Sequence, residues 1–277
     1  ATLRRQRQMC IRDSLLLRHV RQAPEGTLIG AALDGDGDRC LLLVAESDGP
    51  AVVDGDAMAL RLLEAGARDR TWTVAASIES DLALSSSAQA MPHVGHVMET
   101  AVGDRWLSVA LGNASEAETP CVVGVEDSGH LVLPSRCPSG WSLVGDGAAS
   151  LVAVLLAGLG RHGAVRQAGG WKKRVSIAPA ERSRWTGDGP LADAVLATVH
   201  AALPHAVQIT AGGLDAEPNL LMVQGTIDGT RFSLGVRNSG TQAKTSLSAR
   251  VDHPRAAAQM EALLTALDGV LRPALTP

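Results

Sequence analysis

Three aspartates separated by single glycines form the stretch of this sequence with the clearest chemical meaning. Asp34, Asp36 and Asp38 each bring a carboxylate to a short segment that ends in Arg39. Carboxylates so close together can converge on one hard cation, and the intervening glycines let the backbone curl around it. Without a cation, the same three negative charges repel one another. We therefore predict a metal site at Asp34, Asp36 and Asp38.

Two other interpretations compete for this acidic segment, an EF-hand calcium loop and a solvated turn. An EF-hand requires Gly at its sixth position and Glu at its twelfth, but those positions hold Arg39 and Ala45. The EF-hand is therefore excluded, while the solvated turn stays as the alternative. Because a guanidinium makes bidentate bonds to phosphate, Arg39 is predicted to bind a phosphate that also contacts the metal. A salt bridge to the neighbouring aspartates is its other possible role.

A second polar segment, Glu126–His130, follows the apolar run Val122–Val125. Alpha/beta proteins place ligand contacts where a strand ends in a small polar turn. Glu126 and Ser128 can exchange hydrogen bonds with sugar hydroxyls. His130 can contact a phosphate or move a proton, because its ordinary pKa lies near neutrality. Alone, this segment is weak evidence, since a single histidine is more often structural.

A third segment, Arg237–Lys244, joins two predicted strands near the end of the chain. It offers an arginine, a lysine, two hydroxyls and a glycine, which together form a plausible phosphate cradle. It matches neither the P-loop nor the dinucleotide-binding pattern, so neither a nucleoside triphosphate nor a dinucleotide is indicated. A polar hairpin without a ligand is the alternative.

Helical and strand patterns alternate through the first part of the chain, which predicts α/β units with a largely parallel sheet. Apolar runs at 27–33 and 40–45 predict buried strands on either side of the acidic segment. Beyond Gly169, a run of four strands lies between two predicted helices, which indicates a separate α+β domain. The predicted fold is thus mixed α/β, with a smaller α+β domain at the C-terminal end.

The bulk composition is that of an ordinary globular protein, with 45% hydrophobic and 19% charged residues. A formal net charge of -4 gives no reason to expect a nucleic-acid partner. The four cysteines show neither paired nor zinc-type spacing, and no apolar run is long enough to cross a bilayer. A cytoplasmic protein with reduced thiols, without a membrane or nucleic-acid partner, is expected.

In this order, the three segments resemble the signature loops of the α-D-phosphohexomutase superfamily. Asp34–Arg39 is similar to its magnesium loop, Glu126–His130 to its sugar loop and Arg237–Thr241 to its phosphate loop. Three shorter segments also look like family landmarks: Val53–Asp56, Val102–Arg105 and Val144–Gly147. The first two of these favour the phosphoglucosamine mutase branch slightly. The resemblance covers nearly everything after Ser14.

The resemblance implies an enzyme that interconverts hexose 1-phosphate and hexose 6-phosphate, with glucosamine, glucose or mannose as the sugar. Phosphate passes through a phosphoserine and a bisphosphorylated sugar, with Mg²⁺ as cofactor. Mg²⁺ on the three aspartates and Arg39 would stabilise the transferring phosphoryl group, with His130 as a further catalytic residue. Glu126 and Ser128 would bind the sugar. Arg237, Ser239, Gly240 and Thr241 would anchor the distal phosphate.

The resemblance also divides the chain. Residues 15–52 are expected to be the end of domain 2, residues 53–170 domain 3 and residues 171–277 domain 4. Residues 1–14 are expected to be an adapter-derived artefact, because residues 4–13 resemble a translated sequencing-library adapter. A basic arm that binds nucleic acid or membrane is the alternative for that stretch.

The chain departs from the family in several places. No Ser-His-Asn-Pro segment is present, so the phosphoserine loop is expected to be missing and this chain alone to be inactive. Asp127, Asn238, Gln242 and Ala243 replace residues common in relatives. A non-catalytic sugar-phosphate-binding protein is therefore the second hypothesis, and a fragment without a biological role is the third.

Overall fold

The computed structural model describes residues 23–277 except 48, 113–117, 119, 159–167 and 241. The helix end predicted at 15–21 and the adapter-like stretch lie outside the described residues. Contacts between Cα atoms divide the chain into two compact units. Unit 1 comprises Ala1–Ser77, Ala88–Met98 and Gly103–Gln167, and unit 2 comprises Ile78–Ser87, Glu99–Val102 and Ala168–Pro277.

A three-stranded antiparallel sheet carries the acidic segment in unit 1. Its strands are β1 (Leu28–Leu33), β2 (Cys40–Glu46) and β3 (Gly49–Val53), in the order β1-β2-β3. The central strand alternates, since Cys40, Leu42 and Val44 are fully buried while the residues between them are partly exposed. This period of two is the pattern of a strand with one face against a core. Both strands predicted around the acidic segment are present, but only β2 is buried as predicted, because no residue of β1 is fully buried and Leu33 is exposed.

A five-stranded sheet forms the centre of unit 1, with strand order β5-β4-β6-β7-β8. The strands are β4 (Trp72–Ser77), β5 (Val94–Thr100), β6 (Val122–Val125), β7 (Leu131–Cys137) and β8 (Gly140–Gly145). Strand β4 pairs parallel with β6, whereas β6, β7 and β8 pair antiparallel. The expectation of a largely parallel sheet was therefore wrong. The cause is a hairpin, β7–β8, whose polar residues gave no strand pattern.

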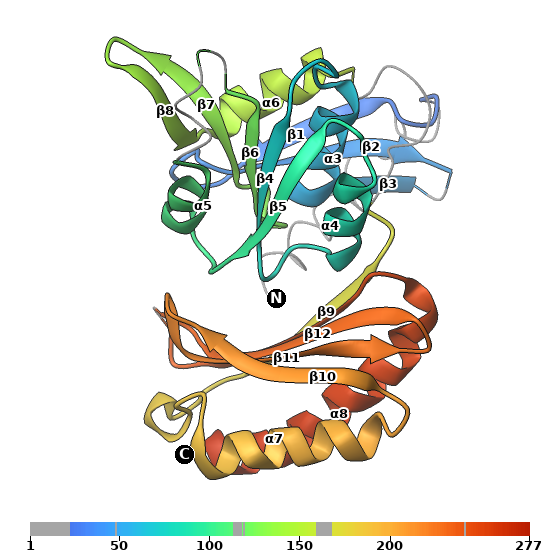
Figure 1. Ribbon diagram of the computed structural model, residues 1–277, viewed down its shortest axis with the longest axis vertical. Helices are drawn as coiled ribbons and strands as arrows, with labels where there is room; N and C mark the ends of the chain where they lie inside the picture. Colours follow the sequence, from blue (N-terminus) through green and yellow to red (C-terminus); the bar gives the residue numbers. More distant parts are fainter. Residues whose placement is uncertain (1–22, 48, 113–117, 119, 159–167, 241) are drawn as a thin grey trace. The chain divides into compact units, whose positions relative to one another are not determined.

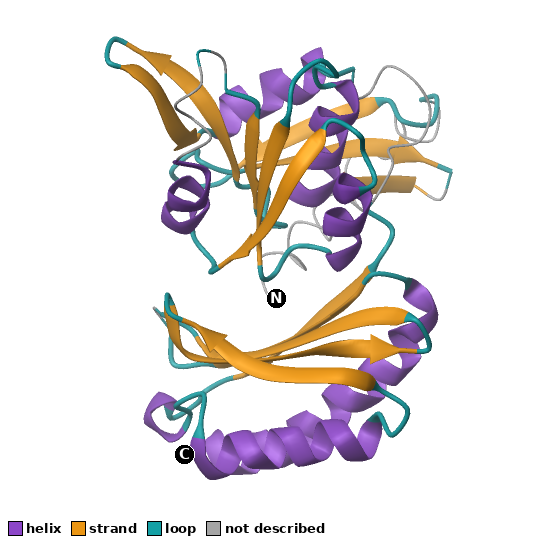
Figure 2. Cartoon of the chain, viewed as in Figure 1, coloured by secondary structure: helices purple, strands orange, loops and turns teal. Residues whose placement is uncertain are grey.

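Helices cover this sheet. They are α3 (Gly55–Ala65), α5 (Asp104–Leu111) and α6 (Gly147–Leu156). A further helix, α4 (Leu82–Gln89), lies mostly within the residues of unit 2. Leu107 and Leu111 of α5 form a buried cluster with Val122 and Val132 of the sheet, while α3 and α6 pack against each other and against β6 and β7. All four residues of β6 are buried, as expected for a strand covered on both faces. Figure 2 shows the helices around the strands of this unit.

Unit 2 has a five-stranded antiparallel sheet with strand order β10-β11-β12-β13-β9. The strands are β9 (Trp171–Ile177), β10 (Val207–Leu214), β11 (Glu217–Ile227), β12 (Thr230–Asn238) and β13 (Thr245–Val251). The helices α7 (Gly189–Ala202) and α8 (Ala257–Leu275) lie along one face of it (Figure 1). Short 3₁₀ turns occupy Arg182–Arg184 and Pro254–Ala256. The core between sheet and helices includes Trp185 and Phe232, both almost fully buried.

The predicted fold class is confirmed: a mixed α/β domain of three layers is followed by a smaller α+β domain. Within the described residues, no helix is both long and apolar enough to span a membrane. The division at residues 14, 52 and 170 stays a prediction.

Candidate functional site

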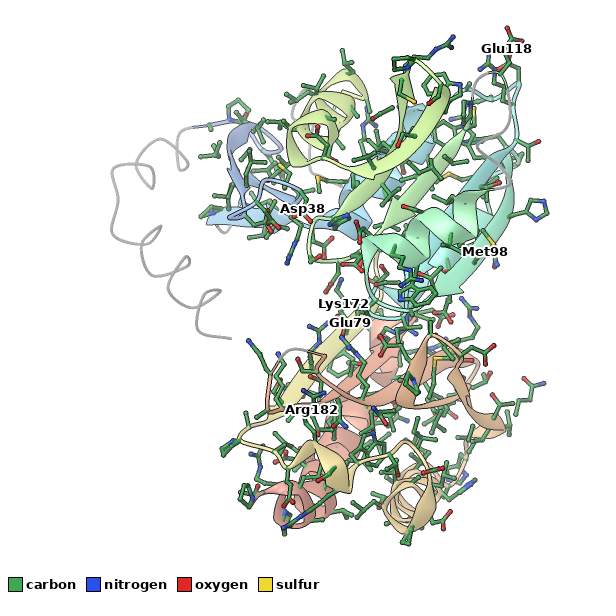
Figure 3. All side chains as sticks on the ribbon, turned by 90° about the vertical axis from the view of Figure 1, so that its left-hand side faces the viewer. Asp38, Glu79, Met98, Glu118, Lys172 and Arg182 are labelled. Atoms are coloured by element: carbon green, nitrogen blue, oxygen red, sulfur yellow. The ribbon has the colours of Figure 1, made fainter. Side chains whose placement is uncertain are left out.

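The acidic segment folds into a compact loop between β1 and β2, where Asp38 is labelled in Figure 3. Asp34 organises it: its Oδ1 accepts hydrogen bonds from the backbone N–H groups of Gly37 and Arg39, both at 3.2 Å. Gly37 has a φ of 79°, a left-handed conformation that favours glycine. The glycines therefore have a defined role, since the turn at Gly37 lets the carboxylates gather on one side.

Arg39 forms ion pairs inside the same loop. Its Nε lies 2.9 Å from Asp34 Oδ2 and 3.5 Å from Asp38 Oδ1. Burial raises the pKa of the Asp34 carboxyl, but the Arg39 backbone N–H and the Arg39 guanidinium outweigh that effect and hold this pKa below its ordinary value. Asp34 therefore stays ionised to lower pH than an isolated aspartate, which suits a cation ligand.

The geometry of the three aspartates fits a divalent cation. One carboxylate oxygen from each lies within 4.8 Å of the other two. Two ligands on opposite sides of Mg²⁺, at about 2.1 Å each, would be about 4.2 Å apart, so small side-chain rotations suffice. Asp38 Oδ1 is also buried without a hydrogen-bond partner among the described residues. The Arg39 guanidinium faces this oxygen with its Nε 3.5 Å away, and a bound cation would supply the closer partner that a buried carboxylate oxygen needs.

The turn Glu126–His130 lies directly beside this loop. Arg39 and His130 form an isolated antiparallel β-bridge, and the Cys40 N–H donates to Gly129 O at 3.0 Å. The Glu126 N–H donates to His130 O, and the Gly129 N–H to Glu126 O, which closes the turn. The structure thus brings the predicted metal-binding and sugar-binding residues of unit 1 together through backbone hydrogen bonds.

Within the turn, the Glu126 carboxylate is already oriented. Its Oε1 accepts a 2.6 Å hydrogen bond from the Gly103 N–H, and its Oε2 accepts one from the Ser128 hydroxyl at 3.3 Å. Glu126 and Ser128 are both partly exposed. Such a preset acceptor matches the role predicted for a sugar ligand.

Three turns in which glycine and aspartate are adjacent support the two loops, and we call them the glycine–aspartate turns. They are Asp54–Gly55, Gly103–Asp104 and Gly145–Asp146, which lie within the three landmark segments. Each begins a helix, because Asp54, Gly103 and Asp146 occupy the N-cap positions of α3, α5 and α6. In two of them the aspartate side chain accepts from a backbone N–H of the first turn, as an N-cap residue should.

The glycines of these turns allow close approach. A Cβ on Gly55 would lie 1.9 Å from Glu126 O, and one on Gly145 would lie 2.1 Å from His130 Nε2. Gly147, next to the third turn, donates its N–H to Gly37 O at 2.9 Å. Sequence reasoning noticed these segments only through the family resemblance. Nothing in their local pattern showed that they pack against the loops.

His130 is buried, with its Nδ1 3.3 Å from Asp38 Oδ2. The prediction that it contacts a phosphate or moves a proton stays a prediction.

The predicted phosphate segment belongs to unit 2, where it joins β12 to β13. Arg237 forms ion pairs with Glu79 at 3.0 Å and Glu217 at 3.7 Å. The Ser239 N–H donates to Lys244 O at 2.9 Å, and Arg182 reaches Gly240 O at 3.5 Å. Thr241 lies outside the described residues. Sequence analysis missed Arg182, which is labelled in Figure 3, because it precedes the segment by more than fifty positions.

Asn238 holds the base of this segment. Its side-chain amide donates to Arg182 O and Trp185 O, both at 2.9 Å, and its carbonyl accepts from the Thr245 hydroxyl at 2.9 Å. It is 8% exposed. Asn238 is therefore a structural residue that fastens the segment to the preceding chain. The departure from the family pattern at this position has a clear packing reason.

The fold and these loops define a multidomain α/β protein with a carboxylate cluster beside a polar turn at a strand end. Residues 54–164 match the family model described as "Phosphoglucomutase/phosphomannomutase, alpha/beta/alpha domain III". Curated relatives match a stretch of similar length. The phosphoglucosamine mutase of Sorangium cellulosum is 37% identical over 123 residues, or 43% of this chain and 23% of that protein. That of Acidothermus cellulolyticus is 40% identical over 120 residues, 42% of this chain and 24% of that protein.

Solved structures match over a longer range. An N-acetylglucosamine-phosphate mutase in its substrate complex, described as a member of the α-D-phosphohexomutase superfamily, has a TM-score of 0.58 at 17% identity. That match covers 90% of this chain and 49% of the other. Aspergillus fumigatus N-acetylphosphoglucosamine mutase in complex with GlcNAc-6P and magnesium has a TM-score of 0.58 at 18% identity. This second match covers 92% of this chain and 50% of that structure. The chain thus spans about half of these structures.

These findings confirm the resemblance for residues 54–164, which match the phosphoglucomutase/phosphomannomutase domain III family, and the solved structures show that the wider chain shares their fold.

Proposed function

We propose that this chain is the metal-, sugar- and phosphate-binding part of a phosphohexomutase. The observation that carries the proposal is the carboxylate cluster of Asp34, Asp36 and Asp38, hydrogen-bonded through its loop to the turn that presents Glu126 and Ser128. A cation site adjacent to hydroxyl-binding groups suits a ligand that carries both a phosphate and a sugar. The matches cover at most about half of each relative, so the activity of the whole enzyme is part of this proposal.

The three aspartates would hold Mg²⁺, and the magnesium named for the A. fumigatus neighbour supports this choice. Bound there, the ion would supply positive charge next to a transferring phosphoryl group. Arg39 is half exposed and adjacent to the cluster, so its guanidinium can add hydrogen bonds to the same phosphoryl oxygens. Asp34 would keep Arg39 oriented.

Glu126 and Ser128 would bind hydroxyl groups of the hexose. The Gly103 N–H holds Glu126 in place before the sugar arrives, so that little side-chain entropy is lost on binding. In unit 2, Arg237, Ser239, Gly240 and Thr241 would bind the distal phosphate. That phosphate would compete with Glu79 and Glu217 for the Arg237 guanidinium.

An amino sugar is the favoured hexose. The curated relatives at 37% and 40% identity are named phosphoglucosamine mutases. An additional carboxylate, Asp127, lies in the turn Glu126–His130, which we call the sugar turn. There it could pair with the ammonium group of glucosamine. Glucose and mannose phosphates are the alternatives. The reaction would pass through a bisphosphorylated sugar and a phosphoserine outside these 277 residues, in the cytoplasm, and the chain alone would bind without turnover.

Isothermal titration calorimetry with glucosamine 6-phosphate in Mg²⁺ buffer tests this proposal. The chain should bind, and Arg237→Ala should weaken binding at least about tenfold, the effect of losing one charge-assisted bond of roughly 1.5 kcal/mol. Arg184→Ala is the matched control, because Arg184 is an exposed arginine of the same unit that pairs with Glu181. Absence of binding, or equal losses in both variants, would contradict the proposal. Glucose 6-phosphate and mannose 6-phosphate, titrated in parallel, decide the sugar.

A further inference from the structure

His130 offers very little surface to a ligand. Its side chain is 5% exposed, and the imidazole is placed against the acidic loop with Nδ1 3.3 Å from Asp38 Oδ2. Its other ring nitrogen, Nε2, is buried without a hydrogen-bond partner among the described residues. The carboxylate that the ring contacts therefore belongs to a predicted metal ligand.

The surroundings of His130 hold both its backbone and its imidazole ring in place. The β-bridge to Arg39 holds the His130 backbone beside the acidic loop, and the Glu126 N–H donates to His130 O at 2.9 Å. On the other side lies Gly145, where a Cβ would be only 2.1 Å from Nε2. The imidazole is therefore held between Asp38 and a glycine that leaves room for it and for nothing larger.

We propose that His130 is a positioning residue for the cation site: Nδ1 holds Asp38 Oδ2 and so presents Asp38 Oδ1, which Arg39 Nε faces at 3.5 Å, to the ion. Oδ1 is the buried oxygen that has no hydrogen-bond partner among the described residues. Groups that orient a metal ligand without touching the metal commonly decide affinity, because they fix the ligand before the ion binds. The inference rests on the proposed cation site and assigns His130 a role toward Asp38 instead of the substrate.

The same role explains Gly145. Any side chain there would push the imidazole toward Asp38, so the glycine is required by the histidine. The close contact of Gly147 with the acidic loop, through its hydrogen bond to Gly37 O, comes from the same turn. The segment with His130 and the segment with Gly145 and Gly147 thus together position the Asp38 carboxylate.

Mn²⁺ binding to the 277-residue chain tests this role, followed by the EPR signal of free Mn²⁺ and by calorimetry. His130→Ala should weaken Mn²⁺ binding about tenfold or more, the usual effect of losing such a group. His130→Asn should restore most of that loss, because the amide nitrogen of Asn occupies nearly the position of Nδ1. His93→Ala is the matched control: His93 is equally buried in unit 1, but its Nε2 contacts Leu63 O at 2.8 Å.

Each outcome has a distinct meaning. If His130→Ala binds Mn²⁺ as tightly as the wild type, the positioning role is refuted. If His130→Asn is as weak as His130→Ala, or His93→Ala weakens binding equally, packing rather than Nδ1 is responsible and the role is also refuted. If the wild type binds no Mn²⁺, the cation site itself fails and this inference falls with it. Circular dichroism without metal shows which variants are folded, and His130→Asn keeps the test decisive if His130→Ala is not.

Discussion

The replacement Gly55→Ala tests how tightly the sugar turn is packed. Gly55 is the first residue of α3, and its φ is not in the left-handed region, so the backbone itself tolerates alanine. The added Cβ would lie 1.9 Å from Glu126 O, whereas contacts below 3.0 Å are essentially never found. The helix and the turn must therefore separate by at least 1.1 Å, the difference between these two distances.

That displacement should lower both stability and affinity. Forcing an extra methyl into a closely packed site destabilises a protein by about 1–3 kcal/mol. A loss of about 2 kcal/mol would lower Tm by roughly 4–8 °C in a domain of this size. Because Glu126 moves away from the Gly103 N–H, glucosamine 6-phosphate should bind at least about tenfold more weakly. Urea unfolding, thermal scans and calorimetry measure these quantities.

Gly30→Ala is the control for this experiment. Gly30 lies in β1 of the same unit, and a Cβ there would meet nothing within 4 Å. It should leave affinity unchanged and alter stability by less than about 1 kcal/mol. A Gly55→Ala variant with wild-type stability and wild-type affinity would refute the close approach of α3 to the sugar turn.

Three further outcomes follow from the structure. Asn238→Ala should reduce the free energy of unfolding by about 2–4 kcal/mol, because it leaves three partners unpaired, two of them on the buried residues Trp185 and Thr245. Asn238→Asp should recover only part of this in urea unfolding, since it loses both donated bonds. Burial raises the pKa of the Cys40 thiol. The contribution of this thiol to the free energy of unfolding is therefore present below its pKa in the unfolded chain and is lost as pH rises through its pKa in the folded protein. Under native conditions a thiol reagent should therefore modify Cys121 well before Cys40, and equal rates would contradict this order. The lowered pKa of the Asp34 carboxyl gives the opposite pH dependence of stability. Its contribution to the free energy of unfolding is present above the unfolded pKa and is lost as pH falls through the folded pKa. Arg39→Gln should raise the Asp34 pKa in an NMR titration, and an unchanged value would show that the ion pair does not form in solution.

The parts of the site that could be predicted are local in sequence. Asp34, Asp36 and Asp38 lie within one loop, so their residue types and spacing were enough to predict convergence. The strands on either side were equally visible, because each is a short continuous apolar run, at 27–33 and at 40–45. A sequence pattern predicts an element or a site where all the residues that define it lie in one continuous segment.

The rest depends on contacts between distant segments. Neither the position of His130 against Asp38 nor the clearance at Gly145 leaves a periodic pattern, because each depends on how separate turns meet. The hairpin β7–β8 was missed because its strands interrupt the apolar pattern with Ser135 and Arg136. Asn238 looked like a departure in a ligand loop, and only its three partners reveal a structural residue.

The glycine–aspartate turns have a consequence for how such a site can change over evolutionary time. They hold the sugar turn and the acidic loop mainly through backbone atoms and the absence of a Cβ at Gly55 and Gly145. Side chains such as Asp127 can therefore vary without disturbing the frame that supports them. With the proposed function, selectivity for the sugar would be separable from the architecture, and one scaffold could acquire a new preference through single exchanges in the turn. The same separation makes Glu126–His130 a practical segment for transplanting specificity between relatives, provided that both glycines are kept.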